Sequence, residues 1–220
     1  MSVGSHFRTS ASTGEITIQA TKADLQAFSA FVSAVPKAAA NAQRRAINKT
    51  LGWLRTHIAR AVGQKEGIAM KAVRQRLRTY LVRGGTMRGK LWFGLNPLEA
   101  SRTGRARQTR TGVSVGRRRY AGAFYKKVYG GAPDIWIRTG SKHFSADDYP
   151  ASDVSGAGGP SSGWISENDS RFPLAKAKIE LDDVLPLFRS WTQQAEKRFL
   201  ELLKQELNFE LQKHRSKGRG

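Results

Sequence analysis

The clearest helical pattern lies in the first third of the chain. Its apolar positions are three or four residues apart: Ile47, Leu51, Leu54, Ile58 and Val62. This spacing places them on one helical face, which would point toward a core. Pro36 is tolerated in a first helical turn, and Gly63 and Gly67 follow the last apolar position. The pattern therefore predicts a helix from Pro36 to Val62, followed by a turn.

A second long pattern occupies the end of the chain. The stripe consists of Phe188, Trp191, Ala195, Phe199 and Leu202, and it is widened by Leu200, Leu203, Leu207 and Leu211. Asp182 or Asp183 can cap such a helix, and Pro186 suits its first turn. We expect a long C-terminal helix whose stripe, including Phe188, Trp191 and Phe199, belongs to the core.

Two shorter helices are expected in the first half of the chain. One begins at Thr21 or Asp24 and ends at Val35. The other runs from Ile68 to about Leu81 and carries many basic residues beside its apolar stripe. Gly84 and Gly85 then follow, as is typical after the end of a helix.

Short alternating or β-branched runs predict strands in the remaining sequence. They cover 15–20, 89–95, 113–115, 135–138 and 173–181. Polar, Gly-rich sequence predicts an exposed hairpin arm or loop at 101–112 and a long loop at 141–169. We therefore expect an α+β fold in which long helices at both ends pack on a small antiparallel sheet. A single domain is predicted over 14–213, between a flexible tail at 1–13 and a basic tail at 214–220.

Positive charge is concentrated in one part of the sequence. The 220 residues contain 38 Lys or Arg, 17 Asp or Glu and no Cys, with a net charge of +21. Residues 35–130 hold 23 of the basic residues and only two acids, Glu66 and Glu99, and the rest of the chain is neutral. This asymmetry indicates one cationic surface that attracts polyanions. The alternative is a solvated helix face with a basic loop. The lack of cysteine excludes disulfide scaffolds and thiol catalysis.

Patterns typical of catalysis are weak. His143 with Asp147 and Asp148 has no established metal-ligand spacing, and His57 is expected to be a structural or surface residue. Residues 140–142 lack the full phosphate-loop pattern. We therefore predict no catalytic, cofactor or metal site, and a basic nuclease or phosphotransferase is the weakest alternative. No run approaches the roughly 18 apolar residues of a membrane span.

Arginines are the remaining candidates for a functional surface. Seven lie between 101 and 120 and are predicted to contact DNA or an acidic partner: Arg102, Arg105, Arg107, Arg110, Arg117, Arg118 and Arg119. A second group is expected on basic helix faces: Arg44, Arg45, Arg55, Arg74 and Arg78. Tyr120 and Phe124 are nearby aromatics; we expect Phe124 in the core, whereas Tyr120 fits either core or surface. No motif for reading base sequence is present.

Three motifs, in order, resemble the minor tail protein Z family of long-tailed phages. Residues 35–40 (VPKAAA) and 45–50 (RAINKT) resemble the opening helix of the family, and 73–77 (VRQRL) resembles its second basic helix. Residues 118–124 (RRYAGAF) are similar to its Arg-Arg and Gly-Ala-Phe signature. The resemblance covers roughly 25–212, including a short strand followed by a long leucine-striped helix.

The resemblance implies a non-enzymatic tail-completion protein with a fold similar to tail-terminator and head–tail neck proteins. It would act at the head-proximal end of the tail, as a homo-oligomeric ring beside tail-terminator or tail-tube proteins, connector proteins and the packaged DNA end. The expected location is the virion, after assembly in the host cytoplasm. The segment 141–169 is longer, and 101–112 less basic, than the family pattern. The alternative function is nonspecific nucleic-acid binding by the 35–130 surface.

Overall fold

The computed structural model describes residues 8–10, 15–20, 22–128, 132–150 and 174–217. They form two compact units, and each unit combines segments that are distant in sequence. The first unit draws on 1–61, 74–94 and 184–220, and the second on 62–73 and 95–183. The single domain predicted over 14–213 thus contains two units. The architecture is mixed, with long helices and small antiparallel sheets, and is compatible with an α+β class.

Helix α3, Pro36–Glu66, confirms the predicted long helix and extends it. Its five stripe residues, from Ile47 to Val62, have no exposed surface. The helix continues through Gly63, so the turn predicted there is wrong. It ends instead where the N–H of Ile68 donates to the carbonyl of Gly63 at 2.9 Å and Gly67 adopts a φ of +62°. This is a Schellman motif, in which glycine takes the left-handed position without strain.

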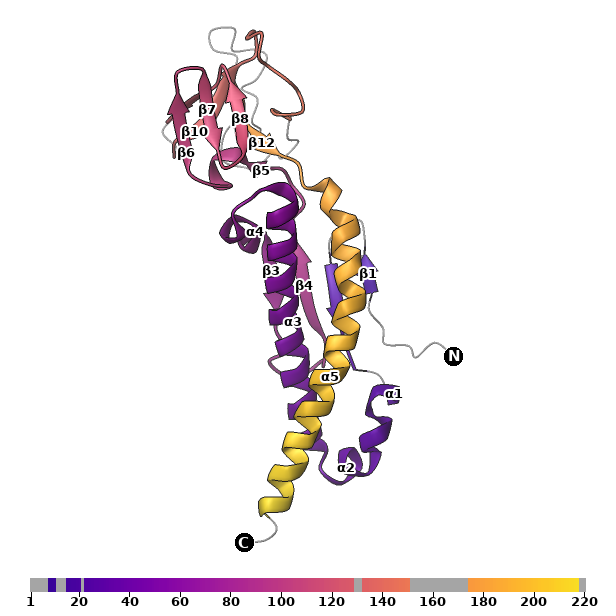
Figure 1. The fold of residues 1–220 in the computed structure, drawn as a ribbon. Coiled ribbons are helices and arrows are strands. Elements are labelled where there is room, and N and C mark those ends of the chain that lie inside the picture. The colour runs from indigo at the N-terminus through magenta and orange to yellow at the C-terminus, as the bar shows by residue number, and fades with distance from the viewer. Residues whose placement is uncertain (1–7, 11–14, 21, 129–131, 151–173, 218–220) are drawn as a thin grey trace. The chain divides into compact units, whose positions relative to one another are not determined.

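Helix α5, Leu185–Lys217, follows a short 3-10 turn, η3, Asp182–Val184. Phe188 and Phe199 of its stripe are fully buried, as predicted, whereas Trp191 is half-buried. The helix continues through 214–217, where a tail was predicted. Helices α3 and α5 lie side by side in the first unit (Figure 1).

A four-stranded antiparallel sheet completes the first unit, in the order β1-β2-β4-β3. Its strands are β1, Arg8–Ser10, β2, Glu15–Ile18, β3, Leu77–Tyr80, and β4, Gly89–Phe93. One face contacts the helices: Phe93 stacks on Phe188 with ring centroids 5.9 Å apart. At Gly89 a Cβ atom would lie 2.5 Å from Ile47, so this glycine permits close approach of the sheet to α3.

Three local predictions for the first half of the chain are wrong. The helix predicted to end at Val35 is divided into α1, Lys22–Leu25, η1, Gln26–Phe28, and α2, Ser29–Ala34. The helix predicted over 68–81 exists only as α4, Met70–Arg76, because 77–80 pairs with β4 as strand β3. Strand β1 likewise lies within the predicted flexible tail and pairs with β2. Strand pairing with distant segments therefore overrides local helix preference at 77–80.

The second unit is built mainly from short strands. Residues 106–121 form a three-stranded meander of β6, Ala106–Thr109, β7, Gly112–Val115, and β8, Arg118–Ala121. A second sheet has the order β11-β10-β9: β9 is Phe124–Lys126, β10 is Asp134–Arg138, and β11 is Leu174–Lys176. Strand β5, Leu98–Glu99, pairs with β12, Lys178–Ile179, and η2, Ala100–Arg102, follows β5.

These elements refine the predictions for the middle of the chain. The strands predicted at 113–115, 135–138 and 173–181 are confirmed, and the predicted hairpin arm at 101–112 contains strand β6. Residues 141–150 of the predicted long loop form turns, and 151–169 lie outside the described residues. No helix in the described ranges is long and apolar enough to cross a membrane.

Candidate functional site

The meander of the second unit has one outward face that carries arginines. Arg107 on β6, Ser114 on β7 and Arg119 on β8 are direct cross-strand neighbours. Side chains opposite one another in an antiparallel sheet share a face. Two residues along each strand lie Thr109, Gly112 and Ala121, of which Thr109 and Ala121 are exposed and Gly112 is buried. We call this surface the arginine face. The side chains of Arg107 and Arg119 are exposed, and Ser114 is half-buried.

The opposite face of the meander belongs to the core. Val113, Val115 and Tyr120 each retain only 2% exposure. Burial raises the pKa of the Tyr120 phenol to about 12, so it stays protonated at neutral pH. Phe124, which was expected in the core, is half-buried. Only Phe124 differs from the prediction, whereas Tyr120, which fitted either core or surface, is turned inward by the strand alternation.

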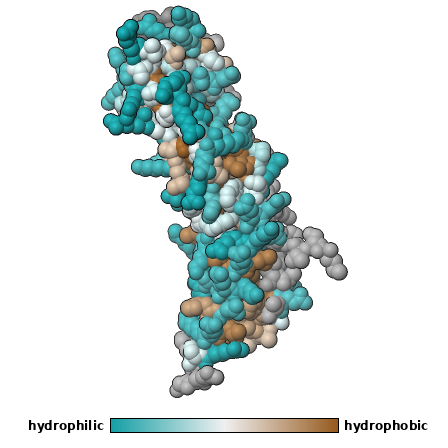
Figure 2. Space-filling view, viewed as in Figure 1, coloured by the Kyte–Doolittle hydropathy of each residue, from teal (hydrophilic) through white to brown (hydrophobic). Residues whose placement is uncertain are grey.

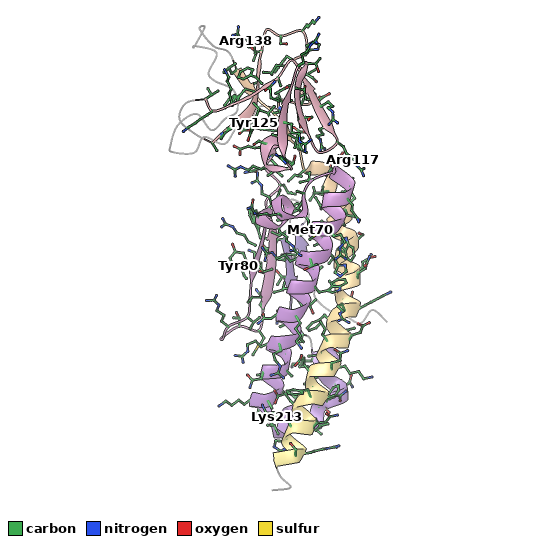
Figure 3. All side chains as sticks on the ribbon, turned by 60° about the vertical axis from the view of Figure 1, so that its left-hand side comes forward. Met70, Tyr80, Arg117, Tyr125, Arg138 and Lys213 are labelled. Atoms are coloured by element: carbon green, nitrogen blue, oxygen red, sulfur yellow. The ribbon has the colours of Figure 1, made fainter. Side chains whose placement is uncertain are left out.

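A glutamine holds the meander to the adjacent sheet. Gln108 on β6 donates from Nε2 to the carbonyl of Gly112 at 3.0 Å and accepts the N–H of Tyr125 at 2.7 Å. Tyr125 lies on β9, and its side chain is labelled in Figure 3. The side chain of Gln108 thus supplies peptide-like hydrogen bonds between two strands. Sequence reasoning missed this residue, because a single polar residue in an arginine-rich segment gives no periodic signal.

Two of the seven candidate arginines are engaged by the only two acids of the 35–130 segment. Arg118 donates to the backbone carbonyl of Glu66, and its Nη2 lies 3.6 Å from the Glu66 carboxylate. Arg102 at the end of η2 pairs with Glu99, three residues earlier on β5. Glu99 also accepts Lys176 at 3.2 Å, and Lys176 lies 3.2 Å from Asp134. These contacts stabilise the second unit and neutralise both arginines.

The other five candidate arginines remain at the surface. Arg107 and Arg119 lie on the arginine face, Arg110 and Arg117 occupy the β6–β7 and β7–β8 turns, and Arg105 precedes β6; all five are exposed. Figure 3 shows Arg117 at its turn. None of the five forms an ion pair with an acid among the residues that the structure describes. Hydrophilic residues dominate the surface of this unit in the view of Figure 2.

The second predicted group of arginines does not form one basic face. Arg45 of α3 pairs with Glu206 at 2.6 Å and Glu210 at 2.7 Å, both on α5. The remaining members have separate surroundings. Arg44 donates a hydrogen bond to Asn41 of its own helix, and Arg55 donates to the carbonyl of Arg74. Arg74 is half-buried in α4, and Arg78 is exposed on β3. Arg45 and Arg55 therefore hold the first unit together.

Glu206 is the centre of the helix–helix ion pairs. It is 5% exposed and accepts both Arg45 and Lys49. Burial by itself would raise the pKa of Glu206, but the hydrogen bonds from Lys49 and Arg45 outweigh it and hold the pKa below its ordinary value. The carboxylate is thus charged at neutral pH and links α3 to α5.

His57 occupies an aromatic cluster of the first unit. Its ring centroid lies 4.4 Å from that of Trp53 and 5.1 Å from that of Trp191. Burial lowers the pKa of His57, and the charges of Arg60 and Arg198 lower it further. The imidazole packs against both indoles, which also contact each other with ring centroids 5.5 Å apart, so that of the two expected roles, structural or surface, the contacts favour the structural one.

The described ranges contain no group of three or more His, Asp or Glu side chains that could hold a metal ion. The second unit instead presents exposed arginines on a sheet, without an ion pair to any carboxylate of the described ranges, and this surface is suited to binding anionic groups. Comparison with known proteins adds no relative. The chain matches no protein-family model, no curated protein and no solved structure.

Proposed function

We propose that this chain is a structural tail-completion protein of a long-tailed phage. It acts at the head-proximal end of the tail and makes the tail competent to join a filled head, without catalysing a reaction. The order of the motifs at 35–50, 73–77 and 118–124 supports this assignment. So does a mixed architecture with two long helices beside a small antiparallel sheet, since tail-terminator and neck proteins combine the same kinds of element.

The arginine face is the observation on which the proposal depends most. Arg107 and Arg119 present positive charge that no described carboxylate neutralises. Such a surface attracts a polyanion or an acidic subunit. At the end of a tail, the available partners are a tail-terminator or tube ring, the head–tail connector and the packaged DNA end. The chain is proposed to assemble there as a homo-oligomeric ring in the virion.

Deletion of the gene from the phage genome that encodes it tests the proposal. Electron microscopy of the lysate should then show filled heads and separate tails, and the infectious titre should fall. Expression of the full chain in trans should restore joined particles. Joined, infectious particles at the undeleted level in the absence of the chain would contradict the proposal.

The second candidate is a nonspecific nucleic-acid-binding protein, which the same arginine face favours. The two functions differ in the deletion experiment. Under the second candidate, particles assemble and join normally without the chain, whereas the purified chain still binds nucleic acid with a steep salt dependence.

A further inference from the structure

The arginine face has a regular geometry. Arg107 and Arg119 flank Ser114 on three adjacent strands in direct register. Neighbouring strands lie about 4.8 Å apart, so the two arginine backbones are separated by roughly 10 Å. Guanidinium groups bind phosphate through paired N–H donors, and a serine hydroxyl can donate between them. The sheet therefore presents a row of three side chains that can donate hydrogen bonds to phosphates.

The charge of this row is available to a partner. The Nη1 of Arg119 donates to the carbonyls of Gly116 and Arg118 at 3.2 and 3.0 Å, which orients its guanidinium at the turn without neutralising it. Glu66 and Glu99, the two acids of the basic segment, are engaged by Arg118, Arg102 and Lys176. The ion pairs of the described residues thus leave the net charge of the row uncompensated.

The composition of the face discriminates between classes of partner. Protein interfaces have an apolar or aromatic centre that excludes water. Beside its polar row, the arginine face exposes only Thr109 and Ala121. Proteins that bind single strands stack bases on exposed aromatic rings. Tyr120, the aromatic residue of the meander, is 2% exposed and turned to the other side. Contacts to phosphates need neither feature.

We propose that the arginine face binds the phosphate backbone of duplex DNA without reading its sequence. Arg107 and Arg119 make the central contacts, with the exposed Arg110 and Arg117 of the adjoining turns beside them. Arg118 and Arg102 take no part, because each of them is paired with an acid of the second unit. This inference rests on the proposed polyanion-contacting role and specifies its partner.

The test is binding of the purified full chain to a fluorescent DNA duplex of about 20 base pairs, by anisotropy, between 50 and 200 mM salt. For each phosphate that a variant no longer neutralises, the slope of log K against log salt should become shallower by about 0.9. R107A/R119A should therefore reduce the slope by about 1.8, equally for duplexes of unrelated sequence. K197A/K204A removes two charges from the surface of α5 and should leave the slope nearly unchanged. Circular dichroism checks folding, and R107Q/R119Q replaces the alanine variant if that variant unfolds.

Three results would overturn the inference. The first is that the unmodified chain and R107A/R119A show the same slope of log K against log salt. The second is that R107A/R119A and K197A/K204A reduce this slope equally. The third is tighter, arginine-independent binding of a single strand of the same length. If R107A/R119A binds the duplex as the unmodified chain does but still fails to support tail joining, an acidic protein occupies the arginine face. That result removes the DNA inference and leaves the proposed tail function intact.

Discussion

Arg118 caps the end of a helix through Glu66. Its Nη1 donates to the carbonyl of Glu66, the last residue of α3, and its Nη2 faces the Glu66 carboxylate. A cation at the C-terminal end of a helix also interacts favourably with the helix dipole. Arg118 thus differs from Arg117 and Arg119, its exposed neighbours in the densest basic run of the chain. Adjacent arginines in one run divide into a structural residue and two surface residues.

Removal of the Arg118 side chain should destabilise the protein, whereas removal of its neighbours should not. R118A should lower the free energy of unfolding by about 1–2 kcal/mol, because it removes a charge-assisted hydrogen bond and leaves Glu66 without its partner. R117A and R119A, as matched controls, should stay within about 0.5 kcal/mol of the unmodified chain. Urea unfolding followed by circular dichroism measures all three. Equal stabilities of R118A and R119A would contradict the capping role.

Gln108 should be required for the connection between the meander and β9. Q108A removes the acceptor of the Tyr125 N–H and the donor to Gly112, and should cost about 0.5–1.5 kcal/mol, because water can partly replace these accessible hydrogen bonds. The amide of Tyr125 should exchange with deuterium faster in Q108A. Q108E keeps an acceptor for Tyr125 and removes the donor, so its exchange at Tyr125 should stay slow. Rapid exchange at Tyr125 in the unmodified chain would rule out this bridge.

Glu206 should make the stability of the first unit depend on pH in the acid range. Its pKa is lower in the folded chain than its ordinary value of 4.5. The unfolded chain therefore binds the proton first as the pH falls. The stabilisation that the Glu206 ion pairs give is full above pH 4.5, and it is lost as the pH falls through the lowered pKa of the folded chain. E206Q should be less stable by about 1–2 kcal/mol at pH 7, and the difference should shrink toward pH 3. Thermal unfolding of both proteins from pH 3 to 7 measures it; a constant difference would contradict the ion-pair role.

His57 should cause a second dependence of stability on pH, between pH 5 and 7. Its pKa lies below its ordinary value of 6.5 in the folded chain, through burial first and then Arg60 and Arg198. The unfolded chain binds more protons below pH 6.5, so this contribution to stability is present above pH 6.5 and decreases as the pH falls toward the lowered value. H57F keeps an aromatic ring against Trp53 and Trp191 and cannot titrate. The melting temperature of H57F should therefore vary less between pH 5 and 7 than that of the unmodified chain. An identical profile would show that His57 does not titrate differently on folding.

Local patterns predicted the long helices well. The stripe of α3 and the proline in the first turn of α5 are short-range signals that tertiary structure did not override. Strand β3 escaped prediction because its identity depends on pairing with β4, and Leu77 continues the helical spacing of Val73. Helix α3 likewise passes Gly63, since the αL position falls on Gly67.

The sequence indicates that the candidate site consists of arginines, but it does not indicate which of them are exposed and share a face. The excess of arginine between 101 and 120 is visible in the sequence, and so is the scarcity of acids. Which arginines are neutralised depends on long-range contacts: Glu66 is 52 positions from Arg118, and Glu206 is 161 positions from Arg45. Strand register then decides that Arg107 and Arg119 share a face while Tyr120 turns inward.

Tail joining in vitro is the decisive measurement for a role in tail completion. Tails from a phage that lacks the gene would be mixed with filled heads, with and without the purified chain, and plaque-forming particles counted. We expect that the chain restores infectivity, that K197A/K204A does so equally, and that R107A/R119A does so poorly. Equal numbers of infectious particles with and without the added chain would contradict a role in tail completion.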